Sequence, residues 1–174
     1  MNILVVYSSR TGNTKKIAQA IQCALPENVT LRNVEEEPNF SECDLVFIGY
    51  WVDKGIADSK AQKFMKQICN KHIALFGTLG AYPESDHAKD CIERTEQLLS
   101  SCTVVDHFLC QGAIDPKLIQ WMKTLPKDDP HGPNKSSLKR WHDAATHPDE
   151  QDYANVSKWA LNVLKKVDAI VSGV

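Results

Sequence analysis

Short apolar runs alternate with amphipathic stretches over the first two thirds of the chain. Continuous runs rich in branched residues are typical of strands that are buried on both faces of a sheet. The five predicted strands cover residues 3–7, 29–34, 44–49, 72–76 and 103–110. Because strands and helices alternate, the pattern predicts an α/β fold, a doubly wound parallel sheet with helices on both faces.

Apolar residues at helical spacing follow four of the five predicted strands. The predicted helices cover residues 17–25, which Pro26 closes, and 61–68, which Asp58 caps, then 88–99 and 152–167. A chain of 174 residues is of a size to bury one sizeable core. We therefore predict a single domain over residues 1–174.

The regular pattern fails between Gln111 and Glu150, a stretch that contains five prolines. Short helices are expected around residues 117–124 and 136–145. Long irregular stretches within a compact domain usually serve a function. We interpret residues 111–150 as an elaboration inserted before the last helix, and we use that name for it below.

Composition narrows the function classes without choosing one. The chain is 43% hydrophobic and 24% charged, with a formal net charge of −2, so no basic face for nucleic acid is expected. No apolar run approaches the roughly 20 residues that cross a membrane, and the N-terminus lacks the basic region of a signal peptide. The six cysteines form no C-x-x-C pair and the histidines no H-E-x-x-H motif. We expect reduced, mostly buried cysteines in a cytoplasmic protein without a metal site.

The stretch Ser8-Ser9-Arg10-Thr11-Gly12-Asn13-Thr14 connects the first strand to the first helix. A helix N-terminus offers unpaired N–H groups and partial positive charge, which suit an anion. Hydroxyl side chains surround this point, and Gly12 permits close backbone approach. The stretch lacks the Lys-Ser/Thr ending of a nucleoside-triphosphate loop and has no G-x-G-x-x-G. It predicts a site for a phosphate monoester. The alternative is a polar turn that only caps the helix, since the same residue types are typical of such a turn.

Two further loops are expected beside the first. Ligands of open α/β sheets lie at the carboxyl ends of the strands, near the point where strand order reverses. The loops predicted there are Ser8–Thr14, Tyr50–Gly55 and Gly77–Asp86. The second contains Tyr50 and Trp51, and the third contains Tyr82. A phosphate loop beside two aromatic-bearing loops predicts a ligand with a phosphate joined to a flat ring.

The run Ser9-Arg10-Thr11-Gly12-Asn13-Thr14 between a strand and a helix resembles the FMN-phosphate loop of flavodoxins, whose common form is [ST]-x-T-G-x-T. The resemblance covers roughly residues 2–110 and the final helix. It implies a five-stranded flavodoxin-like sheet of strand order 2-1-3-4-5 and non-covalently bound FMN. It also implies that the hydroxyls of Ser9, Thr11 and Thr14, with backbone N–H groups through Asn13, hold the phosphate.

The same resemblance suggests which residues lie at the flavin ring. Trp51 is similar in placement to the inner aromatic residue of flavodoxins and Tyr82 to the outer one, with Tyr50 beside Trp51. Backbone groups of Thr78, Leu79 and Gly80 would contact the ring edge. Three alternatives remain open: Arg10 assists the phosphate or points to solvent, Trp51 stacks on the flavin or packs under the second helix, and Pro83 tilts Tyr82 away or does not.

Two features depart from typical flavodoxins. The chain is close to neutral where those are strongly acidic, and the elaboration is longer than a minimal flavodoxin allows. In the latter respect it resembles the flavodoxin-like protoporphyrinogen dehydrogenases, through Gln111–Ile114 and Asp152–Val156. Within the elaboration, Lys135, Lys139, Arg140 and Trp141 form either a solvated helix face or a contact for an acidic partner or a propionate-bearing substrate. Trp121 and Met122 either cover the flavin edge or lie under the final helix.

Three functions are compatible with these observations. The first is an FMN-dependent electron carrier between redox partner proteins, a flavin reductase and an acceptor enzyme, since no acid–base pair accompanies the phosphate loop. The second is an FMN-dependent oxidoreductase that acts on a quinone or a tetrapyrrole, or a protein that supports a tetrapyrrole reductase. The third is a binding module that uses the fold without flavin.

Overall fold

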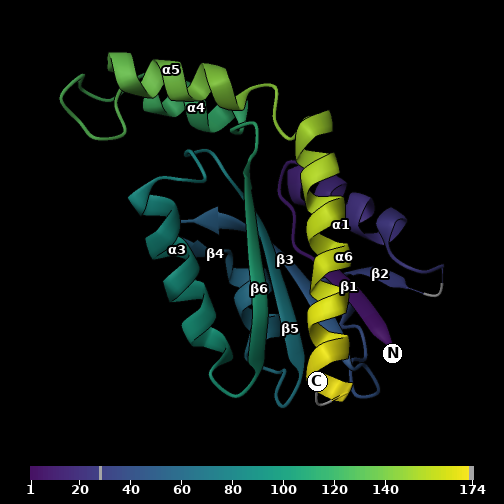
Figure 1. The fold of residues 1–174 in the computed structure, drawn as a ribbon. Helices are drawn as coiled ribbons and strands as arrows, with labels where there is room; N and C mark the ends of the chain where they lie inside the picture. The colour runs from purple at the N-terminus through teal and green to yellow at the C-terminus, as the bar shows by residue number, and fades with distance from the viewer. Residues whose placement is uncertain (28, 173–174) are drawn as a thin grey trace.

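The computed structural model describes residues 1–27 and 29–172 and contains the predicted parallel sheet (Figure 1). The sheet has the order β2-β1-β3-β5-β6. Its strands are β1 (Ile3–Tyr7), β2 (Thr30–Asn33), β3 (Leu45–Asp53), β5 (His72–Leu79) and β6 (Thr103–Gln111). Counted as the five predicted strands, this is the order 2-1-3-4-5, so the predicted fold class is confirmed.

Helices cover both faces of the sheet. On one face lie α1 (Asn13–Ala24) and α6 (Glu150–Ser172), which pack against each other and against the sheet. On the other face lie α2 (Ser59–Met65) and α3 (Asp86–Glu96). Two single-turn 3-10 helices, Val34–Glu36 and Gln97–Leu99, complete the connections. Each face of the sheet has its own hydrophobic core. Phe47 and Val163 belong to the core on the α6 side, and Ile48 and Phe64 belong to the core on the α2 side. Adjacent strand residues alternate between these two cores.

Two strands continue further than the sequence predicts, toward their C-terminal ends. The prediction stopped β3 at Gly49 and β5 at Phe76, but they reach Asp53 and Leu79. Gly77 explains the second difference, because a Cβ at this position would lie 2.8 Å from Tyr50 Cζ and 2.6 Å from Leu109 Cδ2. The glycine therefore makes room for neighbouring side chains within a continuous strand.

A short hairpin at the end of β3 was not predicted. The strand β4 (Ile56–Ala57) pairs antiparallel with Val52 and Asp53. The two connecting residues, Lys54 and Gly55, both have positive φ, at 50° and 82°. Positive φ at both central residues is the requirement of the two-residue turn that matches strand twist. The second loop is thus a fixed hairpin.

The elaboration lies across the C-terminal ends of the strands (Figure 1). It contains α4 (Pro116–Met122) and α5 (Lys135–Ala144), close to the two predicted short helices. Its two ends are held together, since Ala113 N donates a hydrogen bond of 2.8 Å to the carbonyl oxygen of His147. Among the described residues, no helix is long and apolar enough to cross a membrane. All six cysteines are free; Cys91 and Cys110 are buried, whereas Cys23 and Cys69 are exposed.

Candidate functional site

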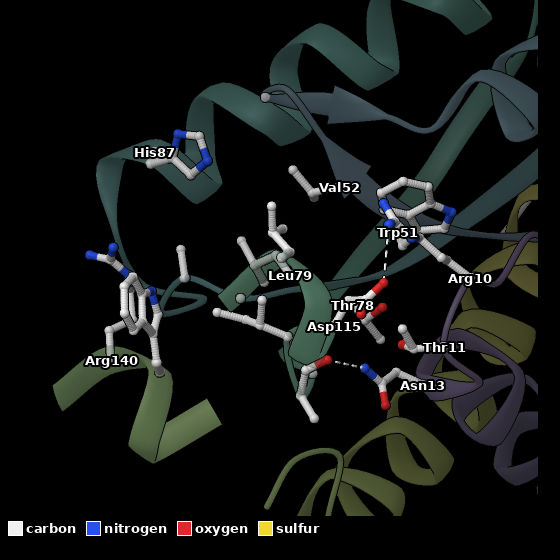
Figure 2. Close-up of a pocket in the computed structure, with 18 of the residues that line it drawn as sticks. Arg10, Thr11, Asn13, Trp51, Val52, Thr78, Leu79, His87, Asp115 and Arg140 are labelled. Carbon is white, nitrogen blue, oxygen red and sulfur yellow. Dashed lines mark hydrogen bonds and ion pairs between the residues drawn. The ribbon is translucent and has the colours of Figure 1, made fainter. Parts of the chain in front are cut away.

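A cavity of about 820 Å³ lies between the C-terminal ends of the strands and the elaboration (Figure 2). Its volume is in the upper part of the range of small-molecule sites. The loops after β1, β3, β5 and β6 all line it, as do residues of α3, α4 and α5. The chain turns to opposite sides of β1 to form β2 and β3, so the cavity lies at the reversal of strand order where ligands of such sheets bind.

The first loop has the backbone geometry of an anion site. Gly12 is the N-cap of α1 with φ 95° and ψ −9°, and no side chain caps this helix. A Cβ at Gly12 would meet no atom within 4 Å, and Gly12 itself is not among the residues that line the cavity. Ser9 Oγ accepts a hydrogen bond of 3.1 Å from Gly12 N, which leaves the Ser9 hydroxyl hydrogen available. Ser9, Arg10, Thr11 and Asn13 all line the cavity.

Thr14 lines the cavity and also forms hydrogen bonds that hold the first loop to the sheet. Its side chain is buried, and its Oγ1 lies 2.9 Å from Thr78 Oγ1 and 3.4 Å from the carbonyl oxygen of Tyr50. A hydroxyl has only one hydrogen to donate. The Thr14 hydroxyl therefore joins the first loop to β3 and β5, and its contact with a phosphate stays a prediction.

Asp58 fixes the first and second loops relative to each other. Its buried carboxylate accepts a hydrogen bond of 2.6 Å from Ser8 Oγ and one of 3.3 Å from Trp51 N. It also caps α2 by accepting from the N–H groups of Lys60 and Ala61. The sequence predicted the cap but neither the bond to Trp51, seven positions away, nor the bond to Ser8, fifty positions away.

Tyr50 does not line the cavity, and here the structure corrects the prediction. Its side chain is fully buried in the core, with its hydroxyl 2.7 Å from His107 Nε2. His107 Nδ1 in turn lies 3.1 Å from Glu96 Oε1. Burial raises the pKa of the Tyr50 hydroxyl, which stays neutral. Only the Tyr50 carbonyl, which bonds Thr14, takes part in the site.

Trp51 faces the cavity, and Arg10 lies over it (Figure 2). The Arg10 guanidinium carbon is 5.6 Å from the centroid of the Trp51 ring, within cation–π distance. Arg10 Nη2 also lies 3.0 Å from Asp115 Oδ2. The half-exposed Arg10 side chain thus connects the second loop to the elaboration, and its contact with a phosphate stays a prediction. Asn13 makes a similar link, with Nδ2 donating to the Ala113 carbonyl at 2.9 Å.

The third loop brings Thr78, Leu79, Gly80 and Tyr82 to the cavity. Gly80 allows close packing of the elaboration, because a Cβ there would lie 2.6 Å from Ile114 Cγ1. The Tyr82 hydroxyl donates a hydrogen bond of 2.7 Å to Asp143 Oδ2 on α5. Lys139 bonds the same carboxylate and lowers the pKa of Asp143, which favours an ionised acceptor for Tyr82.

The elaboration contributes further cavity residues, and for two of them, Met122 and Trp141, the sequence analysis left a ligand contact as one of two alternatives. Leu118 and Met122 of α4 line the cavity, four residues apart on one helical face. Trp121 does not line the cavity and is 56% exposed, so it neither covers the cavity beside Met122 nor lies buried under the final helix. Trp141 of α5 is buried and lines the cavity. Helical periodicity within residues 116–122 was the signal that could have separated Trp121 from Met122.

Two clusters near the site have structural explanations. Cys91 Sγ lies 3.6 Å from Nε2 of the cavity residue His87, but burial raises the pKa of this thiol, which disfavours the nucleophilic thiolate. His147, Asp149 and Asp152 are close enough to share a cation. In the structure Asp152 Oδ2 instead accepts from His147 Nδ1 at 2.6 Å and from Asp149 N at 2.9 Å, which organises the start of α6.

Comparison with known proteins agrees with this geometry. A model of the flavodoxin domain matches residues 4–160. Two relatives carry the name flavodoxin-like domain-containing protein BilS. The one from Clostridioides difficile (strain CD3) is 36% identical over 98% of this chain and 100% of its own length. The one from Clostridium symbiosum (strain WAL-14163) is 30% identical over 88% of this chain and 91% of its own length.

Solved structures show the same fold at low identity. Oxidised flavodoxin 2 from Bacillus cereus superposes with a TM-score of 0.60 at 19% identity, over 95% of this chain and 99% of its own. A flavoprotein in complex with FMN from Lactobacillus acidophilus NCFM reaches 0.51 at 17% identity, over 62% and 92%. Together with the strand order and the match of the family model, these likenesses lead to one conclusion. The chain belongs to the flavodoxin domain family.

Proposed function

We propose that this protein binds FMN in the cavity and carries electrons to a partner enzyme. The observation that carries the proposal is the start of α1, which Gly12 opens without a side-chain cap, beside loops that bring Trp51 and Tyr82 to the same cavity. Family membership supports it, as does the FMN complex of a protein with the same fold.

The residues present fit FMN at both of its ends. N–H groups of the first turn of α1, with the hydroxyls of Ser9 and Thr11, would hold the phosphate. Trp51 and the third loop would enclose the isoalloxazine ring, with backbone groups of Thr78–Gly80 at its edge. The bound flavin supplies the redox chemistry, and this chain's residues bind it, orient it and limit its contact with water.

A carrier needs no side-chain acid or base; two histidines, His87 and His131, line the cavity, but no unpaired carboxylate does among its described residues. Among the described residues that line it, the only carboxylate is Asp115, which pairs with Arg10. The Cys91 thiol beside His87 is buried. Electron transfer through the flavin would therefore proceed to a redox partner, with a flavin reductase as the donor and an enzyme as the acceptor.

A second candidate function is favoured by the elaboration. Ile114, Leu118, Met122 and Trp141 cover the cavity and give it an apolar wall beyond the flavodoxin loops. Such a wall suits an FMN-dependent oxidoreductase that acts on a quinone or a tetrapyrrole, or a protein that supports a tetrapyrrole reductase. This candidate would be favoured over the carrier if the protein turned over a small molecule without a partner protein and lost that activity when the elaboration was shortened.

Titration of the apoprotein with FMN and with riboflavin, followed by flavin fluorescence, tests the proposal. We expect one FMN per chain and a dissociation constant at least about a hundredfold lower than that for riboflavin, because riboflavin lacks the phosphate and forfeits two or more charge-assisted hydrogen bonds. Equal affinities would show that the start of α1 is not a phosphate site, and absence of binding would refute the proposal.

A further inference from the structure

The cavity has a basic end that the FMN loops do not account for. It consists of Lys54 from the hairpin, His87 and Arg94 from α3, and His131 and Arg140 from the elaboration. In Figure 2, His87 and Arg140 lie on the opposite side of the cavity from Arg10, Thr11 and Asn13. We call these five residues the basic end.

Carboxylates are sparse among the described residues that line the cavity, although Asp129 accepts a hydrogen bond of 2.8 Å from His131 N. Asp115, the single carboxylate among the described lining residues, stands on the phosphate side with Arg10. Arg94 is 3.9 Å from Asp90 and 3.5 Å from the Gly55 carbonyl oxygen, both long contacts. Arg140 reaches only Ser137 Oγ, at 3.4 Å, among the described residues. Glu96 bonds His107, and Asp143 bonds Lys139 and Tyr82, outside the lining.

Gathering cations around one cavity costs free energy through their mutual repulsion, and an anion between them removes that cost. A guanidinium group also matches a carboxylate in shape, since it offers parallel N–H donors. The basic end therefore favours an anionic group, such as a carboxylate, over a neutral group.

Much of the remaining cavity wall is apolar. This apolar surface is formed by Val52, Leu79, Ile114, Met122 and Trp141. Trp141 is the largest of these, is 5% exposed and directly follows Arg140 in α5. A ligand with its charge at the basic end would thus lay an apolar body against an indole ring.

We propose that the basic end and this apolar surface bind a flat, apolar organic molecule through its carboxylate, chiefly by Arg94 and Arg140. The site depends on the cavity alone, whereas its position beside the flavin rests on the proposed function. The proposal concerns binding and assigns no chemical step to the bound molecule.

A pair of matched probes tests this proposal. Calorimetric titration of the FMN-loaded protein with 2-naphthoate and with 2-naphthamide compares the same ring system with and without charge. We expect the carboxylate to bind at least about tenfold more tightly, and we expect the double variant Arg94→Gln/Arg140→Gln to lose that preference while it still binds the amide. The variant Arg32→Gln/Lys66→Gln removes the same charge at exposed positions away from the cavity and should keep the preference.

Further measurements distinguish failure of the proposed cofactor from failure of the proposed carboxylate site. Repeating the titrations without FMN tests the site even if the proposed cofactor is wrong, and the carboxylate preference should persist. Equal affinity for the two probes, or an equal loss in the Arg32/Lys66 control, overturns the proposal. A large loss of FMN affinity in the Arg94/Arg140 variant, measured by flavin fluorescence, would assign these arginines to the flavin site and also overturn it.

Discussion

The substitution Gly12→Asp should raise the dissociation constant for FMN at least about a thousandfold, or about 4 kcal/mol. A side chain at Gly12 would stand at the start of α1, next to Thr11 and Asn13, which line the cavity where the phosphate would lie. The aspartate would repel the phosphate and compete for the same N–H groups, each charge-assisted bond contributing about 1.5–3 kcal/mol. Flavin fluorescence during titration measures the change.

Gly12→Asn is the matched control for this prediction. Asparagine has nearly the same shape and tolerates positive φ better than most residues, so it tests the φ of 95° without adding charge. We expect Gly12→Asn to weaken FMN binding much less than Gly12→Asp, with similar thermal stability in the two variants. If the two variants bound FMN within about threefold of each other, charge at the helix start would not govern binding.

The substitution Asp58→Ala should lower the free energy of unfolding of the FMN-free protein by about 3 kcal/mol. Loss of a helix cap costs about 0.5–2 kcal/mol, and the buried Ser8 hydroxyl left without its acceptor costs about 1–3 kcal/mol more. Because Asp58 also accepts from Trp51 N, the variant should bind FMN less tightly as well. Urea denaturation measures the first effect.

Asn134→Ala provides the comparison for Asp58→Ala. Asn134 caps α5 through a single hydrogen bond, to Ser137 N, and joins no second loop. Its loss should cost only about 1 kcal/mol and leave FMN affinity nearly unchanged. Equal destabilisation by the two substitutions would mean that Asp58 acts only as a helix cap.

The sheet was predictable because strands buried on both faces read as continuous apolar runs. The ends of β3 and β5 were not, because Gly49 and Gly77 resemble strand breakers in sequence. In the structure both occur where a Cβ would collide with a neighbouring ring, that of Phe76 at Gly49 and that of Tyr50 at Gly77. The requirement for glycine is tertiary, and a single strand does not reveal it.

The error at Tyr50 follows from the missed extension of β3. Successive strand residues point to opposite faces, so neighbours within a strand cannot both face one ligand. Had β3 been predicted to reach Asp53, Tyr50 and Trp51 would have been assigned to different sides. Treated as loop residues, both were placed at the site, although only Trp51 lines the cavity.

The position of the cavity was predictable from topology, but its outer wall was not. Loops after neighbouring parallel strands must meet at one edge of a sheet. Residues such as Arg94 and Trp141 reach the same cavity from α3 and from the elaboration, through packing that local sequence does not encode. The links Arg10–Asp115 and Asn13–Ala113 place the elaboration there, and each joins residues about one hundred positions apart.

Anaerobic reductive titration of the FMN-loaded protein, followed by visible absorbance, tests the carrier function most directly. A protein that passes electrons one at a time should show two resolved steps, with the one-electron-reduced flavin accumulating before full reduction. Direct passage to the two-electron-reduced flavin, with no intermediate absorbance, would contradict the carrier and favour an oxidoreductase with the elaboration as its substrate wall.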